Sequence, residues 1–165
     1  MPERNSISLF LYIPEKHVIV LGVRASQESY PHLLQATCHG TIEDGEDHAD
    51  AIERELKEET TLNLPDIGPL TFLGELAAGQ KQHEKCSYYL ASITEKNAKK
   101  IQPTAEVGRF IFIAQEEAGM MTPWSVAETK HIDSSHSNVI FDDELEALTM
   151  AFELLDEHEW NLVPA

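Results

Sequence analysis

Three glutamates at helical spacing are the residues of this chain best suited to metal chemistry. Glu55, Glu58 and Glu59 stand at positions i, i+3 and i+4, so an α-helix places their carboxylates on one face. Like charges on adjacent turns repel one another by roughly 0.2–0.5 kcal/mol per pair. Mg²⁺ prefers hard oxygen ligands and bridges carboxylates to substrate phosphates. The spacing alone therefore fits either a magnesium site or an acidic, solvent-exposed helix.

The surrounding helix, predicted over residues 47–60, has a second, apolar face. This face would pack on a sheet, and its members are Ala49, Ile52 and Leu56. Arg54 lies four residues before Glu58 and can orient that carboxylate by a charge-assisted hydrogen bond. Glu46, near the helix start, favours the positive end of the helix dipole.

The loop before the helix extends the pattern in a way that composition alone would seldom produce. Gly40 is followed by five residues, Glu46, seven residues and then Arg-Glu-Leu-x-Glu-Glu, starting at Arg54. This segment, residues 40–62, resembles the signature box of the Nudix hydrolases. The positions that match the box are Gly40, Glu46, Arg54, Glu55, Leu56, Glu58, Glu59 and Leu62.

The segment departs from the box at its end and just before its start. Thr61 stands where the box has its second glycine, past the helix end, where a left-handed backbone is helpful. Threonine is awkward there but takes no part in chemistry, so we expect a modest structural change and retained activity. His39 replaces a glycine that often precedes the box.

The resemblance implies a role for each of these residues. Glu58 and Glu59 would bind metal directly, together with a backbone carbonyl near His39 and Gly40. Glu55 would bind a second metal or act as the general base, and Glu106 is the alternative base. By the resemblance, catalysis is assigned to Arg54, Glu55, Glu58 and Glu106. Metal binding is assigned to His39, Gly40, Glu55, Glu58 and Glu59. Substrate binding is assigned to Arg24 and Glu43, and a structural role in the box to Glu46, Leu56 and Leu62.

The implied activity is Mg²⁺-dependent hydrolysis of a diphosphate linkage, with Mn²⁺ as a second choice of ion. The substrate would be a nucleoside triphosphate or a related nucleoside diphosphate linked to another group. Two alternatives stay open, an enzyme like the isopentenyl diphosphate isomerases and a nucleotide-binding module without catalysis. Cys38 lies near where the catalytic cysteine of those isomerases falls, but the intact carboxylate set favours hydrolysis.

Charge narrows the class of partner. The 165 residues include 12 Lys and Arg against 29 Asp and Glu, a net charge of −17. Such a chain would repel long nucleic acids and anionic membrane surfaces, which both need clustered cations. A small phosphorylated ligand fits if metal ions carry positive charge into the site. A homodimer is expected from the resemblance.

The length of the chain predicts a single domain, over residues 1–165. The cysteine usage predicts a protein of the cytoplasm. Cys38 and Cys86 form no C-x-x-C pair and are expected to be reduced thiols. The first residues lack the pattern of a secretion signal, and no apolar run approaches the roughly 20 residues of a membrane span.

The order of predicted elements is strands, a helix, more strands and a last helix, which favours an α/β/α sandwich with a mixed central sheet, as in the Nudix fold. Strands are predicted over residues 7–13 and 17–23 as a hairpin, and over 72–76, 86–93 and 109–114. Further helices are predicted over 115–121 and 142–155, the latter with Asp142 as its N-cap. Loops are predicted over 40–46, over the basic segment 97–103 and over 123–138. Tyr30 and Trp124 are expected to be packing residues.

Overall fold

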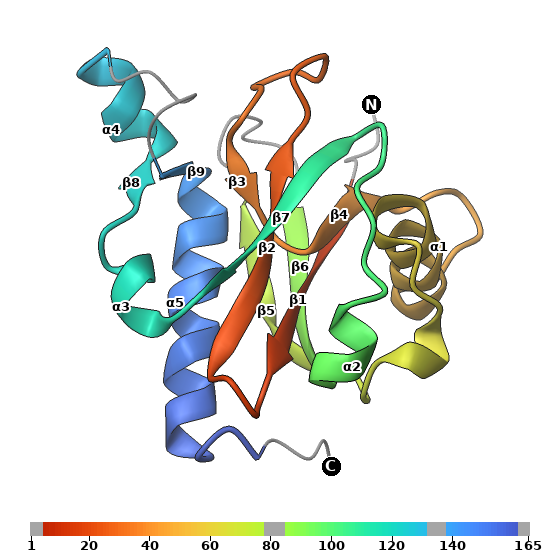
Figure 1. Ribbon diagram of the computed structural model, residues 1–165. Helices are drawn as coiled ribbons and strands as arrows, with labels where there is room; N and C mark the ends of the chain where they lie inside the picture. The colour runs from red at the N-terminus through yellow and green to blue at the C-terminus, as the bar shows by residue number, and fades with distance from the viewer. Residues whose placement is uncertain (1–4, 78–84, 132–137, 162–165) are drawn as a thin grey trace.

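The computed structural model describes residues 5–77, 85–131 and 138–161 (Figure 1). The strands are β1 (Ser6–Ile13), β2 (Val18–Arg24), β3 (Leu34–Gln35), β4 (Cys38–Thr41), β5 (Thr71–Ala77), β6 (Lys85–Ser92), β7 (Val107–Ile113), β8 (Thr122–Pro123) and β9 (Val139–Ile140). The helices are α1 (His48–Thr60), the 3-10 turn η1 (Leu64–Asp66), α2 (Glu95–Ala98), α3 (Gln115–Ala118), α4 (Trp124–Thr129) and α5 (Asp142–Glu157).

β1 is the central strand of a mixed sheet. It runs parallel to β6 on one side and antiparallel to β2 and β4 on the other. All eight of its residues are buried, and successive side chains point to opposite faces. Ile7, Leu9 and Leu11 pack in the apolar cluster that contains α1, whereas Phe10 and Tyr12 pack in the cluster that contains α5.

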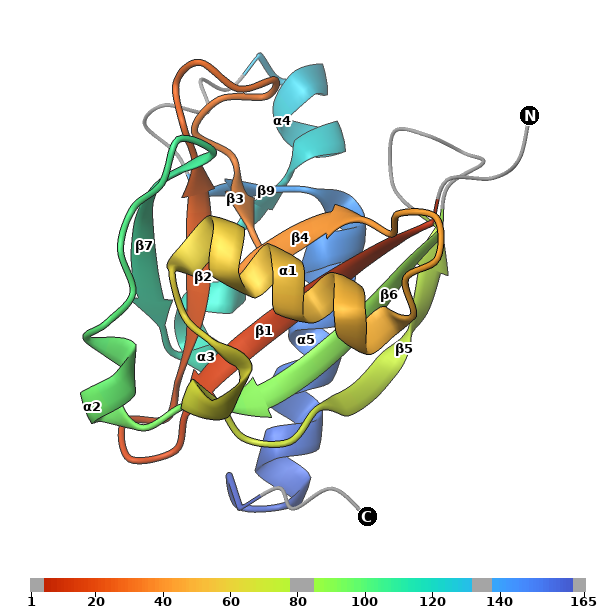
Figure 2. The same ribbon diagram turned by 90° about the vertical axis from the view of Figure 1, so that its right-hand side faces the viewer.

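The two long helices therefore cover opposite faces of the sheet, α1 in front of it and α5 behind it in Figure 2. This arrangement confirms the predicted α/β/α sandwich. On α1 the apolar stripe is Ala51, Ile52 and Leu56, and Ala49, which the periodicity assigned to it, is exposed. Within the described residues, no helix combines the length and the apolar composition needed to cross a bilayer.

The sheet forks where β1 and β2 separate. β1 pairs with β2 from Leu11 to Ile13, and β4 takes the place of β2 beside the first half of β1. Thr37, which is fully buried, fills the fork. Its hydroxyl accepts from the N–H of Leu11 at 2.9 Å and donates to the carbonyl of Val20 at 2.6 Å. One side chain thereby satisfies two backbone groups that the ladder leaves unpaired.

The ends of α1 follow the chemistry of its sequence. Asp47 is the N-cap and accepts from the N–H of Asp50 at 2.8 Å, while the Asp50 carboxylate accepts from the N–H of Asp47. Thr61 ends the helix in the left-handed region, at φ 68°, where a β-branched residue is strained. The αL geometry expected of the missing box glycine is thus adopted by threonine.

Strand positions are predicted better than loops. The hairpin of β1 and β2 and the strands β5, β6 and β7 are confirmed, as are α1 and α5. The loop predicted over 40–46 is wrong at its start, because Gly40 and Thr41 belong to β4 and pair with β1. The helical turn α2 includes Asn97 and Ala98, the first two residues of the basic segment that was predicted to be a loop. Cys86 and Cys38 form no disulfide, as expected.

The C-terminal half of the chain holds two further corrections. Residues 124–129, which belong to the segment predicted to be a loop, form α4. The N-cap of α5 is Phe141, so the prediction of Asp142 as the N-cap is wrong. The Asp142 carboxylate accepts instead from the N–H of Ser125, at 3.0 Å, at the start of α4. This hydrogen bond joins residues 17 positions apart, so the local sequence around Asp142 does not predict it.

Replacing Thr37 by valine tests the role of the fork. Valine keeps the shape of threonine but leaves the N–H of Leu11 and the carbonyl of Val20 without partners. We expect Thr37→Val to lower the free energy of unfolding by about 2–3 kcal/mol, since each buried unpaired group costs about 1–3 kcal/mol. Thermal unfolding measures the effect. Thr41→Val, at the exposed end of β4, is the matched control and should change stability by less than about 0.5 kcal/mol.

Candidate active site

Three carboxylates from two segments converge beside β4. Oxygen atoms of Glu55, Glu59 and Glu106 all lie within 4.8 Å of one another. Glu55 and Glu59 are buried, with 6% and 2% of their surface exposed, whereas Glu106 faces solvent. Two of the three glutamates singled out by their helical spacing therefore belong to this cluster, together with the loop glutamate proposed as a base.

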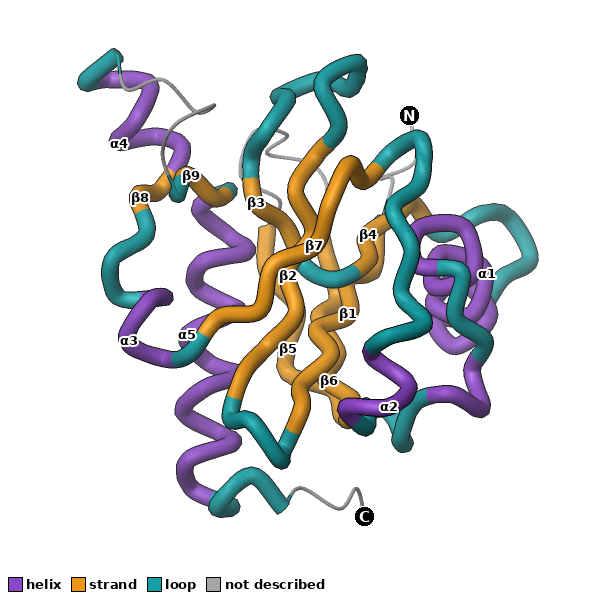
Figure 3. Tube along the Cα trace, in the orientation of Figure 1, coloured by secondary structure: helices purple, strands orange, loops and turns teal. Residues whose placement is uncertain are grey.

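The fold brings Glu106 to α1 through the loop between α2 and β7, which Figure 3 shows passing beside α1. The loop is tied to the helix end, where the N–H of Gln102 donates to the carbonyl of Thr60 at 3.2 Å. It is tied to β2 where the carbonyl of Glu106 accepts from the N–H of Ala25 at 3.1 Å. Backbone hydrogen bonds thus fix the loop at Gln102 and at Glu106.

Gly40 is needed for the burial of Glu55. A Cβ atom at position 40 would overlap the carboxyl group of Glu55 and approach its Cγ to 2.6 Å. Real Cβ atoms do not come that close to another atom, so any side chain at position 40 would displace the carboxylate. The first glycine of the box is therefore a steric requirement of the carboxylate cluster and not a requirement of an unusual backbone angle.

Arg54 connects the loop of the box to the carboxylates. Its guanidinium donates twice to Glu46, at 2.8 and 2.9 Å, and once to Glu55, at 2.6 Å. It also donates to the carbonyl of Thr41 at 2.9 Å and lies 3.5 Å from a carboxylate oxygen of Glu58. The predicted pairing of Arg54 with Glu58 is confirmed as a longer contact within this larger network.

Burial and like charge both disfavour ionisation in the cluster. Burial raises the pKa of Glu55, against the hydrogen bond from Arg54, which lowers it. Burial and the neighbouring charge of Glu55 raise the pKa of Glu59 to about 10, although the N–H of His39 donates to Glu59 at 3.2 Å. A further positive charge beside Glu59 would stabilise the ionised form of both carboxylates.

The protein family of the chain follows from a match to a known domain. The model of the NUDIX domain matches residues 2–133. The chain belongs to the Nudix family. The resemblance drawn from the box is confirmed, and the family places the chain among the enzymes that hydrolyse phosphoric anhydrides. No curated protein sequence matches the chain significantly.

Solved structures of the Nudix fold superpose over most of the chain. A MutT/Nudix family protein from Enterococcus faecalis is 14% identical with a TM-score of 0.66, and the match covers 95% of this chain and 63% of that protein. An Ap4A hydrolase from C. elegans, in a binary complex, is 19% identical with a TM-score of 0.63, covering 93% and 98%. The NUDIX domain of Shewanella oneidensis NrtR, complexed with ADP ribose, is 15% identical with a TM-score of 0.60, covering 94% and 90%. At these identities the likeness concerns the fold.

The remaining residues assigned by the Nudix box lie around the cluster. Glu58 lies next to Glu59 on α1 but is exposed and outside the group of converging oxygens. Glu43 is exposed, with one oxygen 3.7 Å from Arg54. Leu56 and Leu62 are buried in the apolar cluster under α1. These positions leave the metal and substrate roles of Glu58 and Glu43 as predictions.

Arg24 is more firmly held than a free substrate-binding arginine. Its guanidinium donates to Ser29 at 2.7 and 3.2 Å and to the side chain of Gln35 at 3.0 Å. It also lies over the ring of Phe141, 5.9 Å from the centroid. The buried Gln35 then donates to Glu59 at 3.4 Å, so a chain of polar groups links Arg24 to the carboxylate cluster.

Gln35 and Glu144 are buried polar residues that the sequence analysis did not single out. Glu144 accepts from the N–H of Ala36 at 2.8 Å and lies 3.8 Å from the His39 ring, whose Nδ1 is 2.6 Å from the hydroxyl of Ser8. Burial raises the pKa of Glu144 to about 8. The signal was present, because Glu144 stands four residues before Leu148 on the apolar face of α5.

Cys38 has the wrong environment for a nucleophile. It is fully buried, and burial together with the charges of Glu59 and Glu55 raises the pKa of its thiol well above the usual value. The thiolate is the reactive form of cysteine, and it is disfavoured here. Tyr30 and Trp124 pack edge to face at 5.7 Å, and 41% of the Tyr30 surface stays exposed.

The ion pair between Arg54 and Glu46 makes stability depend on pH. The Arg54 hydrogen bonds and the N–H of Glu43 lower the pKa of Glu46 from 4.5 to about 2. A carboxylate whose pKa is lowered by folding adds stability above its unfolded pKa, and that stability is lost as pH falls through the folded value. The contribution is therefore complete near pH 6 and declines between about pH 4.5 and 2.

We accordingly expect Glu46→Gln to lower the melting temperature at pH 6 and to lose most of this deficit relative to wild type near pH 2.5. Thermal unfolding followed by circular dichroism across this range measures the difference. Glu53→Gln, on the exposed side of the same helix, is the control and should show no such convergence. A deficit that stays constant from pH 6 to pH 2.5 would contradict the role of the pair.

Proposed function

We propose that this Nudix chain is a Mg²⁺-dependent pyrophosphohydrolase that cleaves a diphosphate linkage in a small nucleotide substrate. The observation that carries the proposal is the convergence of Glu55, Glu59 and Glu106 within 4.8 Å, two of them buried. A buried group of like charges is unfavourable by itself. A cation that pairs with the carboxylates would stabilise it.

The donor set fits magnesium. Carboxylate oxygens are hard ligands, and Mg²⁺ keeps several waters while it binds one or two carboxylates and substrate phosphates. Glu106 and Glu58 are both exposed, so water has access to this side of the cluster. When bound, the ion would neutralise phosphate oxygens and lower the pKa of a reacting water. Mn²⁺, which also takes oxygen ligands, is the second choice.

The chain's own residues would hold this arrangement in place. Arg54 fixes the Glu55 carboxylate at 2.6 Å, and the N–H of His39 and the side chain of Gln35 fix the Glu59 carboxylate. We propose Glu59 and Glu55 as inner ligands, Glu58 as a ligand from the solvent side, and a carbonyl of the β4 segment at His39 and Gly40 as a further oxygen.

Glu55 and Glu106 remain the two candidates for the general base. Glu55 accepts a hydrogen bond from Arg54, which orients it, and Glu106 is exposed to solvent, which gives it access to water. Substituting a general base and substituting a metal ligand change different kinetic quantities. The Gln variant of the base should lower kcat with little change in the Mg²⁺ concentration needed for half activity, while the variant of a ligand should raise that concentration.

The proposed substrate class is a nucleoside triphosphate or a nucleoside diphosphate linked to a second group. Two proteins of the same fold support it, since one is an Ap4A hydrolase and another was crystallised with ADP ribose. The net charge of −17 favours a small substrate whose phosphates are neutralised by metal over a long nucleic acid. Arg24, within reach of Glu59 through Gln35, is the proposed phosphate contact.

The test is product release from a substrate panel with and without Mg²⁺. The panel holds the (d)NTPs, 8-oxo-dGTP, dihydroneopterin triphosphate, ADP-ribose and diadenosine polyphosphates. We expect turnover of at least one member that requires Mg²⁺, and a loss of about 100-fold or more in kcat/KM for Glu59→Gln. Glu53→Gln, an exposed glutamate on the same helix, is the control and should keep wild-type turnover.

Other outcomes separate the alternatives. Turnover that persists in Glu59→Gln or without divalent ions would contradict the proposal. Tight nucleotide binding without any turnover would favour the non-catalytic module. Isomerisation of isopentenyl diphosphate that is lost in Cys38→Ala would favour the isomerase, which the burial of Cys38 opposes.

A further inference from the structure

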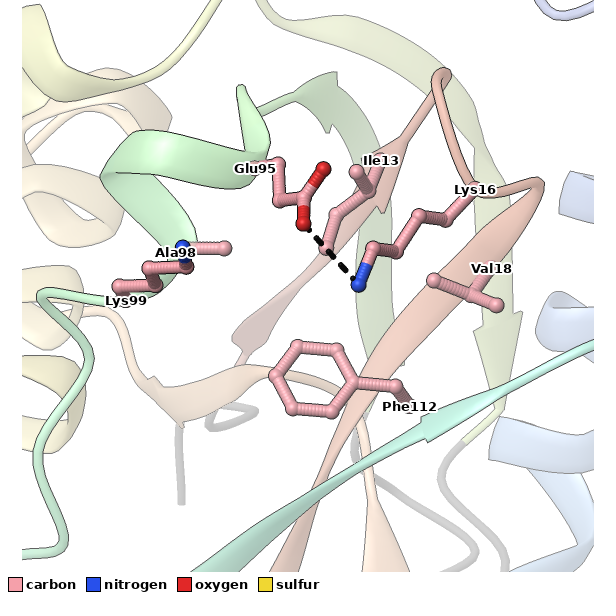
Figure 4. Close-up of a pocket in the computed structure, with 7 residues that line it drawn as sticks. All are labelled: Ile13, Lys16, Val18, Glu95, Ala98, Lys99 and Phe112. Carbon is pink, nitrogen blue, oxygen red and sulfur yellow. Dashed lines mark ion pairs between the residues drawn. The ribbon is translucent and has the colours of Figure 1, made fainter.

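A pocket of about 300 Å³ lies outside the carboxylate cluster, between α2 and the ends of the β1–β2 hairpin and β7 (Figure 4). It is lined by Ile13, Lys16, Val18, Glu95, Ala98, Lys99 and Phe112. Its volume is at the lower end of the range of small-molecule sites, and like them it has mostly apolar walls with few charged groups.

The pocket is remote from the catalytic residues. Ile13 ends β1, whereas Gly40 pairs with Ile7 near the start of the same strand. Six residues of extended chain, at about 3.3 Å per residue, put roughly 20 Å between these two positions. A ligand here would therefore not compete directly with a substrate held at Glu55 and Glu59.

The walls expose apolar surface to solvent. Phe112, on β7 opposite Val20 of β2, has 49% of its surface exposed. Its ring points into the pocket, and the buried residues Ile13 and Ala98 form the inner wall. A planar apolar group that covered the Phe112 ring would remove this surface from water, which is favourable.

The charges at the rim favour an anion. Lys16 pairs with Glu95 at 3.1 Å, so these two charges cancel. Lys99 is exposed, and among the residues that the structure describes its side chain has no ion pair or hydrogen bond. The lining thus carries two lysines against one glutamate, a local excess of positive charge on a chain whose net charge is −17.

We propose that this pocket binds a small molecule that has a planar apolar body and one anionic group. The body packs between Phe112, Val18 and Ile13, and the anionic group pairs with Lys99 at the rim. The proposal is independent of the hydrolase activity, because no residue of the pocket belongs to the carboxylate cluster or to the network of Arg54.

The probe for this site is 8-anilinonaphthalene-1-sulfonate, which combines two aromatic groups with one sulfonate and fluoresces when shielded from water. We expect the folded full-length chain to bind it at one site per chain in a fluorescence titration. Phe112→Ser should weaken binding about tenfold or more, and Lys99→Glu about fivefold or more. Both residues are exposed enough for these variants to fold, which thermal unfolding would verify.

Matched controls distinguish binding in this pocket from nonspecific binding to other exposed apolar surface. Phe72→Ser removes another exposed phenylalanine, on β5. Lys96→Glu reverses the charge of an exposed lysine on α2, and neither residue lines the pocket. Both variants should bind the probe within about twofold of wild type. N-phenyl-1-naphthylamine, which lacks the sulfonate, should bind wild type and Lys99→Glu within about twofold of each other, since the charge no longer contributes.

Three results would overturn the proposal. The first is no binding of the probe to the folded wild type. The second is equal loss of binding in the test variants and their controls, which would assign the fluorescence to dispersed apolar surface. The third is self-association of the chain in analytical ultracentrifugation that Phe112→Ser abolishes, because a second copy would then be the occupant of this surface.

Discussion

The mutual repulsion of two buried carboxylates on one helix face is the constraint on which the rest of the site depends. Glu55 and Glu59 are placed by the geometry of α1, and burial on the sheet deprives them of water. Glycine at position 40 provides the space for the first, and the N–H of His39 provides a hydrogen bond for the second. β4, which supplies both features, lies beside β1 only because the sheet forks at Thr37.

Arg54 neutralises part of the negative charge of the carboxylate cluster, but several carboxylates share its single positive charge. Among the residues that the structure describes, four carboxylates lie within 4.0 Å of its guanidinium, and the closest contacts go to Glu46 and Glu55. The Glu59 carboxylate has no ion pair with an arginine or lysine among the described residues, and burial together with Glu55 raises its pKa to about 10. One more positive charge beside Glu59 would stabilise its ionised form, and we propose that the metal ion supplies that charge.

Most of this arrangement could be predicted from the sequence where local rules decide it. The shared helix face of Glu55, Glu58 and Glu59, the helix over 47–60 and the strand over 7–13 each follow from one element. Which two of the three glutamates are buried did not follow, because burial depends on how α1 rolls on the sheet. The strand at Gly40 and the link from Arg24 through Gln35 to Glu59 were missed for a similar reason, since each joins segments that are distant in the chain.

The measurement that tests the central claim most directly is the melting temperature of the chain with and without Mg²⁺. A ligand at 100 times its dissociation constant stabilises the folded state by about 2.7 kcal/mol, which corresponds to roughly 5–10 °C for a chain of this size. If Glu55 and Glu59 hold the ion as proposed, Mg²⁺ raises the melting temperature of wild type and of Glu53→Gln, and it does not raise that of Glu59→Gln. An equal rise in Glu59→Gln, or no rise in wild type at millimolar Mg²⁺, would contradict a cation site in this cluster.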